Sequence, residues 1–178
     1  NPQKRIFIGF LLSAVAVALG VQLFVHRLRL KQALAELFSL KIWFSRSARA
    51  DYKLMVINQA LMMGIAPRLI SKLALATLLF EGLHVWFNGR PVILPEAPGW
   101  TIAALFTVSV FLLDDATKYF VHRALHRWPF LWAFHQVHHS AETLTPFTVF
   151  RAHPMESVIF TLRTVIVQAV TISGFLFF

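Results

Sequence analysis

Residues 115–140 read D-A-T-K-Y-F-V-H-R-A-L-H-R-W-P-F-L-W-A-F-H-Q-V-H-H-S, and residues 151–156 read R-A-H-P-M-E. Together the two segments contain six of the eight histidines of the chain. Five of the six have helical spacing: i, i+4 for the first pair and i, i+3, i+4 for the next three. These five are His122, His126, His135, His138 and His139. On a helix both spacings put imidazoles on one face, with Cβ atoms about 5–6 Å apart. The sequence therefore predicts two helical faces that carry metal-ligating side chains.

The number of histidines favours two metal ions over one. Imidazole suits Zn, Fe, Cu and Ni, so the residue type alone does not choose the metal. A structural zinc takes four protein ligands and a catalytic zinc takes three, fewer than the five clustered here. Pro129 supports a shared site, because proline is tolerated in the first turn of a helix and the preceding Arg127 and Trp128 can form a bend. Such a bend would let the two histidine faces converge.

The same residues resemble a known family. The patterns D-x6-H-R-x2-H, F-H-x2-H-H-S and R-x-H-P-x-E are similar to the histidine motifs of the fatty acid hydroxylase superfamily, in its sterol desaturase branch. The resemblance covers residues 115–156. It implies an integral-membrane enzyme whose clustered histidines hold a di-iron centre, which activates O2 against the unactivated C–H bonds of a lipid.

The resemblance also implies roles for individual residues. The implied metal ligands are His122, His126, His135, His138, His139 and His153. His153 precedes a proline, so it either binds metal or only fixes the loop. Arg151 and Glu156 are expected beside the site. Asp115 is seven residues before His122, two helical turns away on the same face, and a ligating histidine usually donates its second N–H to a carboxylate or carbonyl. We therefore expect Asp115 to orient a ligand histidine.

The implied reaction needs two iron ions, O2 as co-substrate and an external electron donor, hence an electron-transfer partner protein. Hydroxylation and desaturation share the same ligands in this family, and sterols, fatty acids and ether lipids all need a long apolar cavity. Two alternatives remain at this stage. One is a zinc-dependent membrane hydrolase, although the glutamate of an H-E-x-x-H motif is absent. The other is a non-enzymatic module such as a bis-histidine haem carrier.

The composition indicates a membrane protein. Hydrophobic residues make up 57% of the chain, charged residues 14%, and the mean hydropathy is +0.64. Soluble domains have about 45–50% apolar and about 25% charged residues. The absence of cysteine excludes disulfides and thiolate metal sites. The net charge of +9 comes from basic residues that flank apolar stretches, which favours anionic lipid headgroups over nucleic acid as a partner.

The expected fold is all-α, with about four membrane-spanning helices. The predicted spans are residues 6–25, 69–87, 100–120 and 155–178. The first is a run of 20 residues without a charge, about 30 Å long as a helix and enough to cross a bilayer. The third is expected to continue as a helix to His126. Residues 54–66 are expected as a separate interfacial or re-entrant helix, and residues 33–44 as an interfacial helix or a solvated loop.

The distribution of basic residues predicts the orientation of the protein in the membrane. Lys and Arg concentrate between residues 27 and 68 and around the histidines, whereas the opposite side has Lys4, Arg5 and Arg90. The positive-inside rule then places the metal site on the cytoplasmic side. We expect residues 1–178 to form a single membrane domain. The family carries a further H-x2-H-H motif downstream that does not follow His153, so we expect this domain to be part of a longer protein.

Overall fold

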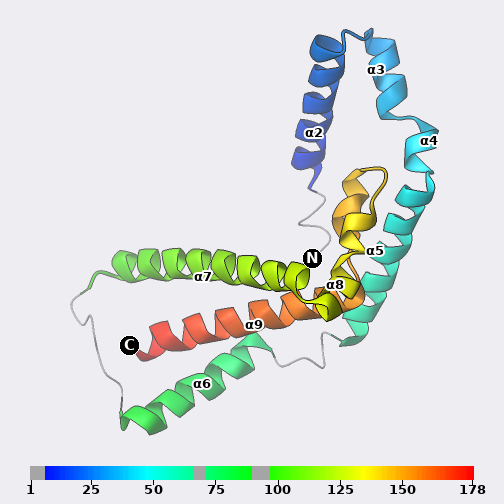
Figure 1. The fold of residues 1–178 in the computed structure, drawn as a ribbon. Coiled ribbons are helices and arrows are strands. Elements are labelled where there is room, and N and C mark those ends of the chain that lie inside the picture. Colours follow the sequence, from blue (N-terminus) through cyan, green and yellow to red (C-terminus); the bar gives the residue numbers. More distant parts are fainter. Residues whose placement is uncertain (1–6, 66–70, 90–96) are drawn as a thin grey trace. The chain divides into compact units, whose positions relative to one another are not determined.

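The computed structural model describes residues 7–65, 71–89 and 97–178, and these residues form helices and no strand (Figure 1). The longer helices are α2 (Ile8–Gly20), continued by the π-helix η1 (Val21–Val25), and α5 (Arg46–Ile65), α6 (Lys72–Phe87), α7 (Gly99–Arg127) and α9 (Pro154–Phe177). The shorter ones are α3 (Leu30–Leu37), α4 (Leu40–Trp43), α8 (Pro129–His135) and the 3-10 helices η3 (His138–Ser140) and η4 (Pro146–Phe150). The all-α prediction is confirmed.

Three helical segments of the described chain are long and apolar enough to cross a membrane. They are Ile8–Val25, Gly99–Arg127 and Pro154–Phe177. They correspond to three of the four predicted spans. The fourth, residues 69–87, begins outside the described residues, and α6 has 16 described residues where a crossing helix needs about 20. A fourth crossing therefore remains a prediction.

The chain divides into two compact units. Unit 1 consists of residues 1–58 and 136–152, and unit 2 of residues 59–135 and 153–178. One boundary falls between His135 and Gln136, so the histidine region contributes to both units. A single membrane domain over residues 1–178 remains a prediction.

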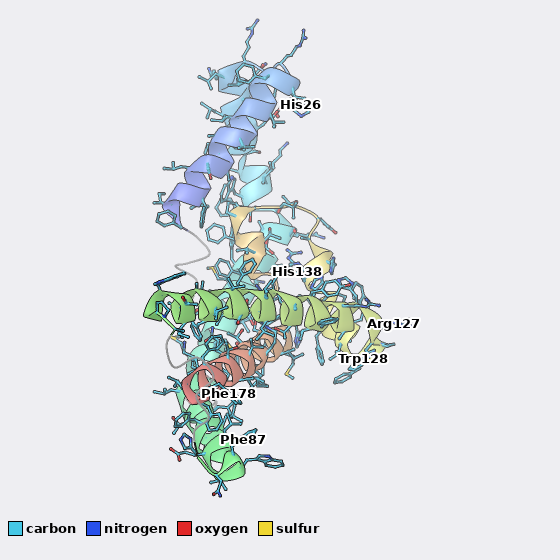
Figure 2. The ribbon with its side chains drawn as sticks, turned by 90° about the vertical axis from the view of Figure 1, so that its left-hand side faces the viewer. His26, Phe87, Arg127, Trp128, His138 and Phe178 are labelled. Carbon is cyan, nitrogen blue, oxygen red and sulfur yellow. The ribbon has the colours of Figure 1, made fainter. Side chains whose placement is uncertain are left out.

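In unit 2, helix α9 lies between α6 and α7 (Figure 1). Aromatic rings hold the three together at the C-terminal end of α9. Phe177 is fully buried, with its ring centroid 5.6 Å from that of Phe87 on α6. Figure 2 labels Phe87 and Phe178 at this end, and their ring centroids are 6.1 Å apart. On the other side of α9, Phe175 packs edge-on against Phe106 of α7 at 5.3 Å. The chain direction of α7 is therefore opposite to that of α6 and α9.

A polar contact joins α7 to α9 further along the same interface. Arg163 of α9 has a side chain that is only 9% exposed, and its Nη1 lies 2.9 Å from Asp114 Oδ1. The same Nη1 also donates to the Asp114 carbonyl and to Thr117 Oγ1, both at 2.9 Å. Lys118 Nζ lies 3.3 Å from the other Asp114 oxygen. Charged groups inside membrane helices are expected to face protein and to be paired, as these are.

Helix α7 continues through the first histidine pair and ends at a bend. Trp128 has an extended conformation, with φ −99° and ψ 122°, because the proline that follows it disfavours a helical backbone at this position. Pro129 then opens α8, where its missing N–H costs nothing. Figure 2 labels Arg127 and Trp128 at this end of α7. The bend predicted from Pro129 is confirmed.

In unit 1, helix α5 carries the segment 136–152. Ser47, Ala48 and Asp51 are buried on one face of α5. The ring centroid of Tyr52 lies 5.1 Å from that of Phe147, and Asn58 Nδ2 donates to the Ala152 carbonyl at 2.8 Å. These contacts make α5 the support on which the segment is held.

Two predictions for this part of the chain are corrected by the structure. Residues 54–66 are not a separate helix, because α5 is continuous from Arg46 to Ile65. Its polar first half is stabilised as a helix by contacts with the segment 136–152, which local sequence does not show. Residues 33–44 form neither one helix nor a loop. They fall in α3 and α4, which are separated at Phe38 and Ser39.

Candidate metal centre

Three histidines of unit 2 converge on one point. His122 and His126 lie one turn apart on α7, and His135 is the last residue of α8. The Nε2 atoms of His126 and His122 are 3.1 Å apart, and those of His135 and His126 are 3.2 Å apart. One ligand nitrogen from each residue lies within 4.8 Å of the other two. We call these residues the histidine trio. The predicted convergence of the two faces is observed for these three residues.

The spacing of the histidine trio suits coordination of one transition-metal ion. Two nitrogen ligands at 2.0–2.1 Å from an ion lie about 2.9 Å apart at an angle of 90° and about 3.4 Å apart at a tetrahedral angle. The two Nε2 separations fall within this range. Three neutral imidazoles suit iron, zinc or copper. Because the trio supplies three ligands, an ion bound there would keep further coordination positions for other groups.

The carboxylate of Glu156 lies next to His135, on the ring nitrogen that does not face the other two histidines. Glu156 Oε2 lies 3.2 Å from His135 Nδ1, and the two side chains are 8% and 1% exposed. A carboxylate at Nδ1 favours the tautomer in which Nε2 is free to bind a metal, and it raises the basicity of the imidazole. Glu156 is in the first turn of α9, where the partial positive charge of the helix end favours a carboxylate.

The ring of Trp132 on α8 packs against two members of the trio. The ring centroid of Trp132 lies 5.3 Å from that of His126 and 6.1 Å from that of His135. Leu125, between the two α7 histidines in sequence, is completely buried. His135 is buried, whereas His122 and His126 are exposed. The site is therefore closed behind His135 and open on the side of α7.

His138 and His139 belong to unit 1, and their predicted position on one α-helical face with His135 is wrong. Helix α8 ends at His135, and the next two histidines lie in the 3-10 helix η3. Their ring planes are nearly perpendicular, at 87°, with centroids 5.2 Å apart. A 3-10 helix has about three residues per turn, so the neighbouring side chains of His138 and His139 point about 120° apart. His138 instead lies 3.1 Å, through Nδ1, from the carbonyl oxygen of Arg151.

His153 lies at the start of α9. Its Nδ1 accepts a hydrogen bond from the Met155 N–H at 3.1 Å, so the side chain caps the helix. Its ring also packs against Phe134, with centroids 4.9 Å apart. These contacts match the expectation that His153 fixes the loop, and they leave Nε2 as the nitrogen through which it can bind a metal. Its role as a ligand remains a prediction.

The structure places Asp115 differently from the expectation. Asp115 is exposed on α7, and its side chain has no hydrogen bond or ion pair within the described ranges. Two helical turns span about 10.5 Å, so a residue seven positions before His122 lies on its face but too far along the axis to reach it. The carboxylate next to a histidine of the trio is that of Glu156. The sequence had indicated Glu156 only as part of R-x-H-P-x-E.

Comparisons with known proteins support the resemblance. Residues 107–178 match the family described as Fatty acid hydroxylase. The chain is 41% identical over 63 residues to a Dictyostelium discoideum protein described as a methylsterol monooxygenase, which is 35% of this chain and 23% of that protein. It is 34% identical over 88 residues to the alkylglycerol monooxygenase of Homo sapiens, which is 49% of this chain and 19% of that protein. No solved structure gives a significant match.

These matches confirm the resemblance to the fatty acid hydroxylase superfamily and its sterol desaturase branch. The matched part of the chain spans about a fifth to a quarter of the length of these relatives. Helix α7 from residue 107 onward, the histidine trio, Glu156 and α9 all lie in the segment that matches the family.

Proposed function

We propose that this chain is part of a membrane-bound, iron-dependent oxygenase that hydroxylates or desaturates a lipid of the sterol or fatty-acyl type. The observation that carries the proposal is the histidine trio, whose nitrogens have the separation of metal ligands at the end of an apolar helix. The similarity of the chain to monooxygenases supports the same class of reaction.

In this proposal the chain holds and orients the ion. His122, His126 and His135 bind one iron through Nε2. The Glu156 carboxylate, with Oε2 3.2 Å from His135 Nδ1, would favour the tautomer that carries the hydrogen on Nδ1 and leaves the Nε2 lone pair for the metal. The ring of Trp132 limits the access of water beside His126 and His135. Precise placement is favoured because two of the ligands lie on one long helix.

A bound iron pair would supply the activation of O2. The overall hydroxylation inserts one oxygen atom into a C–H bond and releases the other as water. This balance needs two electrons and two protons in addition to O2, so the reaction requires an external electron donor. We propose that an electron-transfer protein supplies these electrons, and that α7 and α9 present the site to lipid within the bilayer.

The remaining predicted residues enter the proposal on their sequence motifs. We propose that His138 and His139 bind metal, that His153 contributes through Nε2, and that the metal site is cytoplasmic. A second iron then accounts for the excess of histidines over one ion's needs. A comparison of Asp115→Asn with Glu156→Gln is the test of whether Asp115 orients a ligand histidine.

The two alternative functions make different demands on the trio. A bis-histidine haem needs two nitrogens on opposite sides of the iron, about 4 Å apart at the usual bond lengths, whereas His126 Nε2 lies only 3.1 Å from His122 Nε2 and 3.2 Å from His135 Nε2. A zinc hydrolase needs a general base facing the open coordination positions. Glu156 instead lies at the outer nitrogen of His135.

The test uses the full-length protein purified in lipid nanodiscs. Elemental analysis should give about two irons per chain. Chelation should abolish O2-dependent oxidation of a sterol, fatty-acyl or alkylglycerol substrate, and added Fe²⁺ should restore it. Active protein that contains no iron would refute the proposal. Lipid hydrolysis that Zn²⁺ alone restores would support the hydrolase, and a Soret band in active protein would support the haem carrier.

A further inference from the structure

The most deeply buried carboxylate of unit 1 is far from the histidines in sequence. Asp51 on α5 is completely buried. A buried carboxylate is costly unless it is paired and hydrogen-bonded. Asp51 meets this condition through two side chains of the segment 136–152. Arg151 donates through Nε to one carboxylate oxygen, and Thr148 Oγ1 donates to the other at 2.8 Å.

Arg151 connects Asp51 to the turn that carries the second pair of histidines. Its side chain is 3% exposed. Nη1 donates to the carbonyl of Ser140, the last residue of η3, at 2.8 Å. Nη2 donates to the carbonyl and the hydroxyl of Ser47 on α5, at 2.5 and 3.0 Å. All three guanidinium nitrogens are thus engaged, and the guanidinium is tied to α5 and to the end of η3 at the same time.

The backbone of the same arginine contacts His138. The Arg151 carbonyl oxygen lies 3.1 Å from His138 Nδ1. A carbonyl oxygen can only accept, so His138 Nδ1 must carry the hydrogen in this contact. The neutral imidazole then has its lone pair on Nε2, the nitrogen with which this tautomer can bind a metal. Asp51, Arg151 and His138 therefore form a continuous series of contacts.

We infer that Asp51 is a positioning residue for His138: its carboxylate holds Arg151, and the Arg151 carbonyl keeps His138 in the tautomer and orientation that present Nε2 to a metal. The metal part of this inference rests on the proposed function. The tautomer part does not, because it concerns only contacts within unit 1. Removal of the Asp51 charge leaves a buried guanidinium without its counter-ion, so Arg151 and its carbonyl should shift.

The test compares Asp51→Asn with Glu36→Gln in the full-length protein. Both changes remove one negative charge, but Glu36 is exposed on α3 and lies outside this series of contacts. The first readout is ¹⁵N NMR of histidine-labelled, metal-free protein, with the His138 signals assigned by their loss in His138→Gln. The second is the number of irons per chain after loading with Fe²⁺.

Wild type and Glu36→Gln should show His138 protonated at Nδ1. Asp51→Asn should show a mixture of tautomers and lose about one of the two irons, with the iron of the histidine trio retained. A general loss of folding would instead lower both irons and the helical circular dichroism. If folded Asp51→Asn kept both the tautomer and the iron content of wild type, the inference would be wrong.

A milder variant keeps the inference testable if Asp51→Asn does not fold. Thr148→Val preserves the shape of the side chain and removes the hydrogen bond to the second carboxylate oxygen, together with the bond that Thr148 Oγ1 accepts from the Thr145 N–H. It should shift the His138 signals in the same direction by a smaller amount, and unchanged signals would overturn the inference. Wild-type protein that showed the Nδ1–H tautomer but bound no iron would refute the proposed function and leave the role of Asp51 in place.

Discussion

The histidine trio of unit 2 and the pair His138–His139 of unit 1 are built in different ways. The trio comes from one helix and the short helix after it, and its members are brought together by a single bend at Pro129. The pair lies in a 3-10 turn, and His138 is supported by Arg151, whose ionic partner is 100 residues earlier in the chain. The trio is thus a product of local geometry, whereas the pair depends on tertiary packing. Changes in α5 should therefore affect the pair and leave the trio intact.

The largest effect is expected from removing a ligand of the trio. His135→Ala deletes the buried imidazole whose Nε2 lies 3.2 Å from His126 Nε2. Bound iron should fall by about half or more, and lipid oxidation should fall by more than the roughly 100-fold that marks the loss of a supporting residue. Iron analysis and turnover measurements check this. The control is His26→Ala, since His26 is exposed and distant in sequence from the site; an equal loss there would show that histidine content alone matters.

A smaller effect on metal binding is expected from a change in Glu156, the carboxylate that contacts His135 of the trio. Glu156→Gln keeps the shape of the side chain but removes the negative charge at His135 Nδ1. Metal affinity or activity should fall by about 10–100-fold, the usual consequence of losing the group that orients a ligand. A competition titration with a chelator gives the affinity. Wild-type affinity in this variant would remove Glu156 from the site.

A change in α5, which holds the segment with His138 and His139, should affect that segment and leave the histidine trio unaffected. Asn58→Ala removes the hydrogen bond from α5 to the Ala152 carbonyl. It should lower the free energy of unfolding by about 1 kcal/mol, because one hydrogen bond to a partly buried group is lost. Hydrogen exchange should increase in residues 136–152 and stay unchanged in α7. Equal changes in both regions would contradict the independence of pair and trio.

The smallest effect is expected from a change in Asp115, the residue that sequence spacing predicts to orient a ligand histidine. Asp115→Asn should leave activity and iron content near wild type and change stability by less than about 0.5 kcal/mol, as is usual for exposed positions. Measured beside Glu156→Gln, it decides which carboxylate orients a histidine. A 10–100-fold loss in Asp115→Asn would restore the original assignment.

The parts of the structure that could be predicted were those controlled by neighbouring residues. Hydrophobic length gave the helices that correspond to α2, α7 and α9, and Pro129 gave the bend. The continuity of α5 and the turn at His138 could not be found this way, because contacts between α5 and residues 136–152 stabilise both. The sequence contains one indication that Asp51 is buried and paired. Asp51 is an acidic residue within the basic stretch from Lys41 to Lys53, where a buried partner for a distant arginine could have been considered.

The ion pair between Asp114 and Arg163 has a consequence for the biogenesis of the protein. An arginine at the centre of a membrane helix raises the free energy of insertion by about 2.5–3.5 kcal/mol when it has no partner. Arg163 is well inside α9, and its partners Asp114 and Thr117 are on α7, which is synthesised first. The side chains of Asp114 and Thr117 are therefore already in the membrane when α9 is inserted. Insertion of α9 beside α7 then costs less free energy, because Arg163 finds its partners at once. Replacing Asp114 should then lower the yield of inserted α9 during synthesis, before any lipid or metal is bound.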